Sequence, residues 1–214
     1  MGALMSTAAE NTPGPQGPEP QEERFAWPTP PAGGWTAEDL DRIPGLPPHT
    51  ELIDGGLFFM SPQTYFHLLV VRLLEDALRI QVPDDLEVLR EMTTRLGSRT
   101  RPEPDLMLVP LKAVESLRQS WIDPALILLA VEVVSPESEE RDREVKPRKY
   151  AAAGIRHYWR VENVDDRPVV YVYELDPATE SYAITGIHHD QLRIRVPFPL
   201  DIDLKFARRR PPQP

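Results

Sequence analysis

The chain has 214 residues, a formal net charge of −10 at pH 7 and no cysteine. Without cysteine it can form neither disulfides nor thiolate-ligated zinc sites, which fits a reducing compartment. No apolar run is long enough to cross a bilayer, and the N-terminus lacks a basic region followed by a hydrophobic one. We therefore expect a cytoplasmic protein with no membrane partner.

Composition divides the chain into three parts. Residues 1–34 are rich in Pro, Gly, Glu and Gln and poor in large apolar side chains, so burial cannot offset the entropy of ordering them. Residues 208–214 are Arg, Pro and Gln only. We expect a disordered Pro-rich tail over 1–34, a single domain over 35–206 and a flexible basic tail over 207–214.

The predicted elements begin with a short helix, capped by Thr36 and ended before Pro44. Residues 51–60 follow as two strands that turn through Asp54-Gly55, a strong hairpin signal. From Thr64, apolar residues recur at helical spacing as far as Leu78, so this helix should pack one face on a sheet. Three apolar runs then predict strands, at 86–92, 105–109 and 126–134.

A charged stretch precedes the next predicted helix, which ends at Gly154. Proline is tolerated only in the first turn of a helix, so Pro147 places the helix start near Glu144. Alternating residues beyond Gly154 predict further strands, at 156–161, 169–174, 182–187 and 192–196. Together these elements indicate an α/β fold with a mixed sheet flanked by helices.

Glu132 lies within the most apolar run of the chain, Ala125–Val134. A strand of that composition is buried on both faces. A carboxylate buried there without a partner costs several kcal/mol, by the general penalty for isolated charges, so it needs an ion pair, an altered pKa or a metal.

Two further residues suggest what compensates Glu132. Asp105 follows Pro104 and opens another apolar strand, and Lys146 stands at the start of the helix that follows the Glu132 strand. Two carboxylates on adjacent strands can hold a divalent cation, and a nearby amine can orient water. We take Asp105, Glu132 and Lys146 as the candidate catalytic set.

Each of these residues also has a purely structural interpretation. Asp105 is of a type favoured at turns, and Glu132 could form a buried ion pair with Arg148 or Lys149. Lys146 belongs to a mixed-charge segment typical of a solvated helix face.

The remaining candidates have the same two interpretations. Tyr150 lies one helical turn after Lys146 and could hydrogen-bond in the site, although packing on the sheet is the simpler role. His67 could touch a phosphate or be a structural histidine. His188 and His189 are adjacent on a strand and point to opposite faces, which argues against joint metal binding.

The negative charge argues against strong non-specific binding of DNA, whose affinity comes from phosphate neutralisation. A run of arginines before Asp105 could segregate positive charge near the site: Arg90, Arg95, Arg99 and Arg101. An exposed arginine loop and a DNA contact are both compatible with this run.

The chain resembles the Uma family of endonucleases, a branch of the PD-(D/E)XK superfamily with the restriction-endonuclease-like fold. The matching pieces occur in the family's order: Glu51-Leu-Ile-Asp-Gly55, Pro104-Asp105, Val131-Glu-Val-Val-Ser-Pro136, Asp142 with Lys146, Tyr150, Gly154-Ile155 and Tyr158-Trp159. The resemblance implies a mixed central sheet flanked by helices, with an added antiparallel C-terminal hairpin region.

The resemblance also implies roles for the candidate set. Asp105 corresponds to the acid of the PD half of the motif and Glu132 to the second acid, and together they would bind Mg²⁺ or Mn²⁺. The superfamily's usual lysine position is Val134 here, so Lys146 would supply the amine from the next helix, with Pro147 beside it. The implied activity is hydrolysis of phosphodiester bonds in nucleic acid, with DNA the expected substrate and a homodimer the expected assembly.

A different class of function is compatible with the same fold. The acidic core and the displaced lysine also fit a catalytically inactive, nuclease-fold interaction module. Such a module would not bind divalent metal at millimolar concentration.

Overall fold

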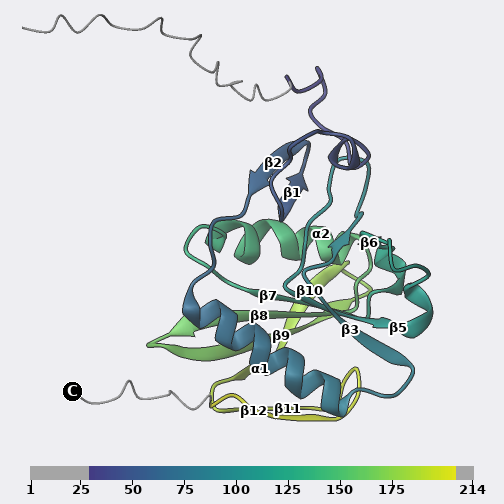
Figure 1. The fold of residues 1–214 in the computed structure, drawn as a ribbon. Coiled ribbons are helices and arrows are strands. Elements are labelled where there is room, and N and C mark those ends of the chain that lie inside the picture. Colours follow the sequence, from purple (N-terminus) through teal and green to yellow (C-terminus); the bar gives the residue numbers. More distant parts are fainter. Residues whose placement is uncertain (1–28, 206–214) are drawn as a thin grey trace, which may run out of the picture.

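The computed structural model describes residues 29–205 (Figure 1). The predicted tail over 207–214 and most of the predicted tail over 1–34 lie outside this range. A six-stranded mixed sheet forms the centre, in the order β10-β9-β8-β7-β5-β3. Within this sheet only β7 and β8 run parallel. The strands are β3 (Leu86–Arg90), β5 (Leu106–Pro110), β7 (Leu129–Val133), β8 (His157–Val164), β9 (Arg167–Asp176) and β10 (Ser181–His188).

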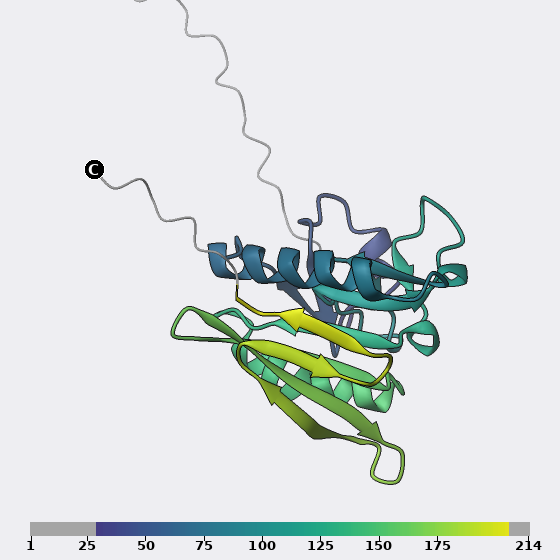
Figure 2. The same ribbon diagram turned by 90° about the horizontal axis from the view of Figure 1, so that it is seen from below.

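Two helices cover opposite faces of this sheet (Figure 2). Helix α1, Tyr65–Gln81, begins where the Thr64 side chain accepts a hydrogen bond from the backbone N–H of His67 (3.2 Å). Helix α2, Lys146–Ala152, is shorter and lies on the other face. No helix within residues 29–205 has the length and apolarity needed to cross a membrane.

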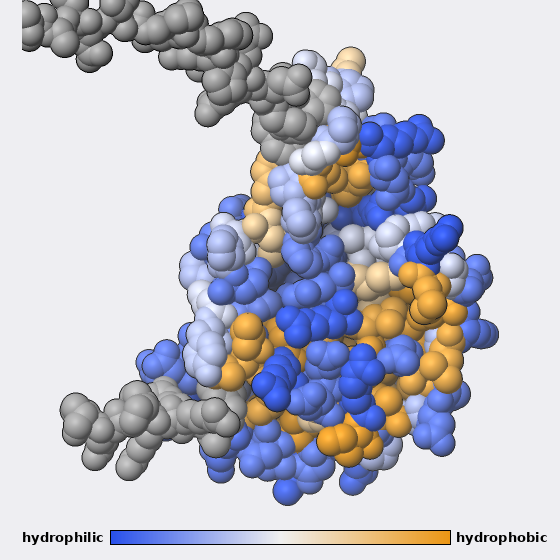
Figure 3. Space-filling model, in the orientation of Figure 1, coloured by the Kyte–Doolittle hydropathy of each residue, from blue (hydrophilic) through white to orange (hydrophobic). Residues whose placement is uncertain are grey.

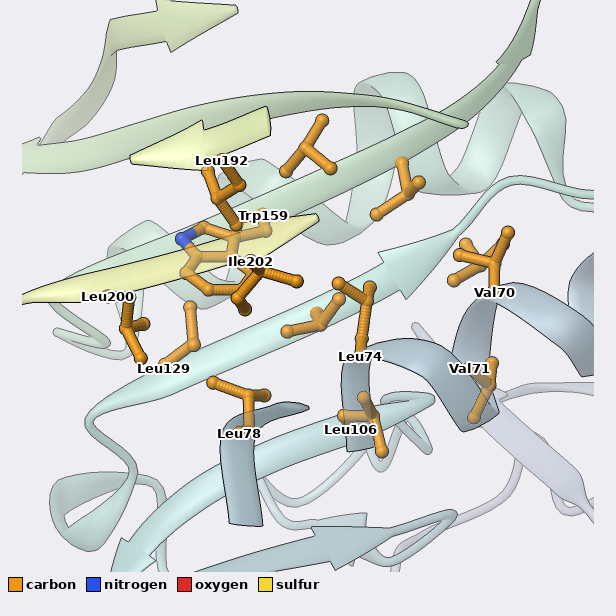
Figure 4. Packing of buried hydrophobic residues seen from close by; sticks show 14 of the residues in the cluster. Val70, Val71, Leu74, Leu78, Leu106, Leu129, Trp159, Leu192, Leu200 and Ile202 are labelled. Carbon is orange, nitrogen blue, oxygen red and sulfur yellow. The ribbon is translucent and has the colours of Figure 1, made fainter. Parts of the chain in front are cut away.

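The α1 face of the sheet is closed by an apolar core. Figure 4 shows side chains of α1 meeting those of the central strands and of the C-terminal hairpin, formed by β11 (Gln191–Ile194) and β12 (Leu200–Asp203). The cluster includes Leu74, Leu106, Val131, Trp159 and Leu192, each fully buried. On the outer side of α1 the surface mixes hydrophobic and hydrophilic patches, with Leu68 and Ile80 exposed (Figure 3).

The α2 face holds a second cluster, which is richer in aromatic residues. Tyr150 and Tyr158 are fully buried, with ring centroids 5.8 Å apart, and pack with Met107 and Ala130 of the sheet. Two of its members reach polar residues described below: the Tyr150 hydroxyl donates to Glu132 and the Tyr158 hydroxyl to the Asp142 carbonyl.

An N-terminal hairpin stands beside α2 (Figure 1). Its strands are β1 (Thr50–Ile53) and β2 (Gly56–Phe59), and Asp54 and Gly55 form the turn with φ of 51° and 86°. Both positive φ values match the tight hairpin turn predicted from the Asp-Gly pair. The Lys149 ammonium lies 2.6 Å from the Asp54 carboxylate and ties this turn to α2.

The predicted architecture is confirmed, including the C-terminal hairpin region, but several elements differ in extent. The helix expected after Thr36 is a single 3₁₀ turn, Asp39–Asp41. Strand β7 begins later than predicted because Pro124–Leu126 forms another 3₁₀ turn, capped by Asp123. The partner strand β12 was not predicted, and the short parallel pair β4 (Thr93–Thr94) and β6 (Trp121–Ile122) was also missed.

The segment before α2 departs most from expectation. Residues Arg141–Val145 form a π-helical turn, and α2 begins at Lys146 rather than near Glu144. Pro147 has no N–H and its ring would clash with the carbonyl four residues earlier in a continuous α-helix. A π-helical turn before the proline accommodates it, with the Lys146 N–H bonding to the Arg141 carbonyl.

Candidate active site

Strand alternation places Glu132 on the α2 face of the sheet. Leu129, Val131 and Val133 of β7 belong to the α1-side core, whereas Ala130 belongs to the α2-side cluster. Glu132 is two residues beyond Ala130 and therefore points to the same face. Leu106 pairs with Val131, so the preceding residue, Asp105, lies next to Glu132 along this edge.

Lys146 is the centre of a buried cluster of charges. Its Nζ lies 2.9 Å from Oε1 of Glu51, 3.1 Å from Oε2 of Glu132 and 3.1 Å from Oδ1 of Asp142. All four side chains are at most 2% exposed. The hairpin, β7, the π-helical turn and α2 each contribute one member, so the cluster forms only in the folded chain.

Tyr150 completes the surroundings of Glu132. Its hydroxyl donates to Oε1 of Glu132 at 2.6 Å, so this residue both packs on the sheet and hydrogen-bonds in the site. The alternative ion pairs of Glu132 are not formed, because Arg148 pairs with Glu144 and Lys149 with Asp54. Lys146 is the cation that compensates Glu132.

Asp105 is oriented by different partners. Its Oδ2 accepts the backbone N–H of Val133 at 2.6 Å, and its Oδ1 lies 2.9 Å from Nε2 of buried His67. Asp105 thus touches the same strand as Glu132 and acts on Glu132 by charge repulsion. The sequence left open whether His67 contacts a phosphate or is structural, and in the structure it contacts Asp105.

Three carboxylates share one ammonium in this cluster. Burial raises the pKa of Glu132 well above its usual value, and the charge of Lys146 only partly opposes this effect. Burial also raises the pKa of Asp142. Burial alone would lower the pKa of Lys146, but the charges of Asp142 and Glu132 outweigh it and raise that pKa well above its usual value. The lysine therefore stays charged, and within residues 29–205 no second cation pairs with these three carboxylates.

The donor set suits a hard divalent cation in its chemistry. Carboxylate oxygens are the ligands that Mg²⁺ and Mn²⁺ prefer. Oε2 of Glu51 is buried and has no hydrogen-bond partner among the described residues, and three carboxylates share the single ammonium of Lys146. Within residues 29–205, no three or more acidic or histidine side chains already converge as a ligand set, so binding requires side-chain adjustment.

A pocket of about 310 Å³ opens beside Asp105. Its lining also includes His49 and Glu103, whose Nδ1 and Oε1 atoms are 2.5 Å apart. The Glu103 N–H donates to Oε1 of Glu51 at 2.9 Å, which connects the pocket wall to the Lys146 cluster. Asp105 thus lines the pocket, whereas the buried side chains of Glu132 and Lys146 are not part of its lining.

The sequence interpretation assigned no site role to Glu51 or Asp142, although both stand in the matched motif pieces. One signal was available for each. Glu51 adjoins apolar residues that are buried with it, and Asp142 precedes Lys146 by four positions, the spacing of helical ion pairs. Their convergence on Lys146 depends on the position of the hairpin, which no local pattern specifies.

The arginine run before Asp105 is engaged within the protein. Arg101 is buried and pairs with Asp41 at 2.7 Å, which contradicts an exposed position for this residue. Arg95 pairs with the same Asp41, and Arg99 donates to the Asp54 carbonyl at 2.7 Å. These arginines hold the N-terminal segment and the hairpin to the domain.

Comparisons with known proteins agree with this architecture. A family model described as "Uma2: Putative restriction endonuclease" matches residues 37–207. A solved structure of a putative nuclease belonging to DUF820, from Anabaena variabilis, matches with a TM-score of 0.53 and 15% identity, covering 76% of this chain and 89% of that chain. The structural likeness shows a shared fold, and the expected restriction-endonuclease-like fold class is confirmed. No curated protein matches the chain.

Proposed function

Because the chain belongs to the Uma2 restriction-endonuclease family, we propose that it is a metal-dependent endonuclease that hydrolyses phosphodiester bonds of nucleic acid. The observation that carries the proposal is the buried contact between Glu132 and Lys146, next to Asp105 at the opening of a pocket. Perturbed ionisable groups of this kind cluster at functional sites. DNA as the substrate and a homodimeric assembly remain predictions from the sequence.

In this proposal Asp105 and Glu132 hold Mg²⁺ or Mn²⁺. The bound cation supplies Lewis-acid polarisation of the phosphate and a lowered pKa for a bound water. The protein's part is to keep both carboxylates in place. The Val133 N–H and His67 orient Asp105, and the Tyr150 hydroxyl orients Glu132. Such outer partners fix the position of ligands and reduce the reorganisation needed during reaction.

Lys146 contributes a fixed positive charge rather than a base. Its raised pKa keeps the ammonium protonated at neutral pH. A protonated lysine cannot accept a proton from water, but its fixed positive charge stabilises the negative charge that develops on the phosphate. The three carboxylates around it fix the position of Nζ.

Cleavage of supercoiled and linear DNA with Mg²⁺ or Mn²⁺ tests the proposal. Glu132→Gln keeps the size of the side chain and removes its charge. Loss of an outer partner of a metal ligand typically costs about 10–100-fold, so loss of a ligand should lower the cleavage rate by at least about 100-fold. Glu144→Gln, which alters an exposed carboxylate paired with Arg148, is the matched control and should cleave like the wild type.

Circular dichroism and thermal unfolding should show that both variants are folded. Equal cleavage by Glu132→Gln and the wild type, at equal purity, would show that Glu132 is not a catalytic residue. Absence of cleavage by the wild type with either metal, on DNA and on RNA, would refute the endonuclease function.

One observation favours a second candidate, the inactive nuclease-fold interaction module. Both oxygens of Asp105 and both oxygens of Glu132 already have partners within the protein. Such a module would take up no Mg²⁺ or Mn²⁺ at millimolar concentration in isothermal titration calorimetry. Metal binding that disappears in Asp105→Asn would reject the module and support the metal-dependent site.

A further inference from the structure

Arg141 is a cation at the candidate site without a carboxylate partner. It is half-buried in the π-helical turn, and its Nε is shielded from solvent without a hydrogen-bond partner. Its neighbours in sequence are neutralised: Arg143 pairs with Glu162 and Arg148 with Glu144. Across the described range, Arg141 forms no ion pair, so no carboxylate there neutralises the charge of its guanidinium.

Two contacts place Arg141 next to the Lys146 cluster. The Arg141 guanidinium lies over the ring of Phe58, 4.9 Å from its centroid. Phe58 is the register partner of Glu51 in the hairpin, so their side chains share one face, and Glu51 contacts Lys146. Independently, the Arg141 carbonyl accepts the backbone N–H of Lys146.

The charge of the site explains why a further cation is needed. The ammonium of Lys146 is surrounded by the carboxylates of Glu51, Glu132 and Asp142, and its positive charge is more than compensated by them. The ammonium of Lys146 is thus already engaged and offers no unpaired positive charge to a phosphodiester. Arg141 supplies positive charge beside the cluster that no carboxylate among residues 29–205 already neutralises.

We propose that Arg141 binds a phosphate of the nucleic-acid strand and positions it at the site of cleavage. The inference rests on the endonuclease function proposed above and deepens it. A guanidinium presents planar paired donors that match phosphate oxygens, and the Phe58 ring beneath it limits its rotation. Arg141 is therefore a substrate-positioning residue, supplied by the same π-helical turn that supports Lys146.

The decisive measurement is binding, because it is independent of cleavage. Fluorescence anisotropy with labelled single-stranded and double-stranded oligonucleotides, in Ca²⁺, gives Kd over a range of salt concentrations. Arg141→Gln should raise Kd by about tenfold, the usual size of a lost charge-assisted hydrogen bond, and lower the slope of log Kd against log salt by about one. Arg141→Lys should recover part of the affinity.

Arg148→Gln is the matched control, since it removes the same charge from an exposed residue that Glu144 already neutralises. It should change Kd less than about twofold, because no phosphate contact is lost. Thermal unfolding of all variants should differ by only a few degrees, since a partly exposed cation–π contact is worth about 0.5–1 kcal/mol.

The inference is overturned if Arg141→Gln and the wild type have equal Kd and salt slope, if Arg148→Gln weakens binding equally, or if the wild type binds neither oligonucleotide. Failure of the proposed function has a different signature. A wild type that binds through Arg141 but never cleaves would refute the endonuclease and leave the phosphate contact standing. Normal cleavage with an unchanged Kd in Arg141→Gln would refute only the phosphate contact.

Discussion

Strand β7 sends Leu129, Val131 and Val133 to the α1 face of the sheet, and Ala130 and Glu132 to the α2 face. The first face packs into a large apolar cluster, whereas the second carries a lysine and three carboxylates beneath a hairpin. The two faces of β7 therefore lie in different environments, one apolar and one charged.

The difference indicates where stability and function reside. Apolar burial on the α1 face stabilises the fold at any pH in the working range. The charges on the α2 face are desolvated, and a buried ion pair of this kind contributes little net stability even though breaking it is costly. The α2 face should therefore respond to pH and to divalent cations, and the α1 face should not. Four experiments test this contrast, from the largest expected effect to the smallest.

Removal of the Lys146 ammonium should lower the free energy of unfolding more than any other change. Lys146→Met leaves three buried carboxylates without their shared ammonium, and breaking a buried pair costs about 3–5 kcal/mol. Because the carboxylates of the variant take up protons more readily than those of the wild type, the loss should be greater at pH 8 than at pH 5. Urea unfolding at both pH values measures it, with Lys149→Met as the partly exposed control.

A cavity on the α1 face should lower the free energy of unfolding by the same amount at every pH in the working range. Leu74 is fully buried against the sheet, and Leu→Ala changes in cores cost about 2–5 kcal/mol through lost burial and the cavity left behind. We expect Leu74→Ala to lower the free energy of unfolding equally at pH 5 and pH 8. A loss that varies by more than about 1 kcal/mol between these pH values would contradict the separation of the two faces.

Glu132→Gln should separate charge from shape at the candidate site. A carboxyl whose pKa is raised by folding holds its proton more tightly in the folded state, so its contribution to stability falls as pH rises from the ordinary value through the raised one. Each unit of the rise is worth about 1.4 kcal/mol. The variant should match the wild type at low pH and become relatively more stable as pH increases.

Thermal unfolding across pH 4–8 measures this difference. Saturating Mg²⁺ should stabilise the wild type and not the variant, because a ligand stabilises only the state that binds it. If the advantage of Glu132→Gln over the wild type does not grow as pH rises, Lys146 already compensates the charge of Glu132 completely.

The smallest effect should come from the helix cap that precedes His67. Thr64→Ala removes the side-chain acceptor for the His67 N–H and should cost about 1 kcal/mol. Because this cap fixes the first turn of α1, from which His67 reaches Asp105, metal affinity should also fall slightly. Thr93→Ala removes a different threonine hydroxyl, which donates to the Ser120 carbonyl, and should leave metal affinity unchanged.

Local patterns were sufficient to predict most of the fold. The Asp54-Gly55 pair predicted the hairpin, and the apolar spacing after Thr64 predicted α1, because both signals arise within a few neighbouring residues. Strand β12 was missed although Leu200–Asp203 alternates buried and exposed residues. Four residues that closely follow two prolines give too short a pattern to separate a strand from a loop.

The candidate site was predictable in part. Glu132 and Lys146 were paired on chemical grounds, and the structure brings them into contact, while their catalytic role and the metal remain proposals. Glu51 was not assigned because it reaches Lys146 from an early hairpin far away in the sequence. The π-helical turn was also beyond prediction, since Pro147 indicated a break in helical geometry but not the form that the break would take.

That π-helical turn makes the site unusually sensitive to chain length. Each residue added to or removed from a helix rotates the downstream residues by about 100°, because an α-helix has about 3.6 residues per turn. A single insertion within Arg141–Val145 would therefore redirect Lys146 away from Glu132 even if every side chain of the cluster were kept. Point substitutions around the turn should be tolerated far better than insertions, so homologues with a longer segment here would retain the sheet and lose the cluster.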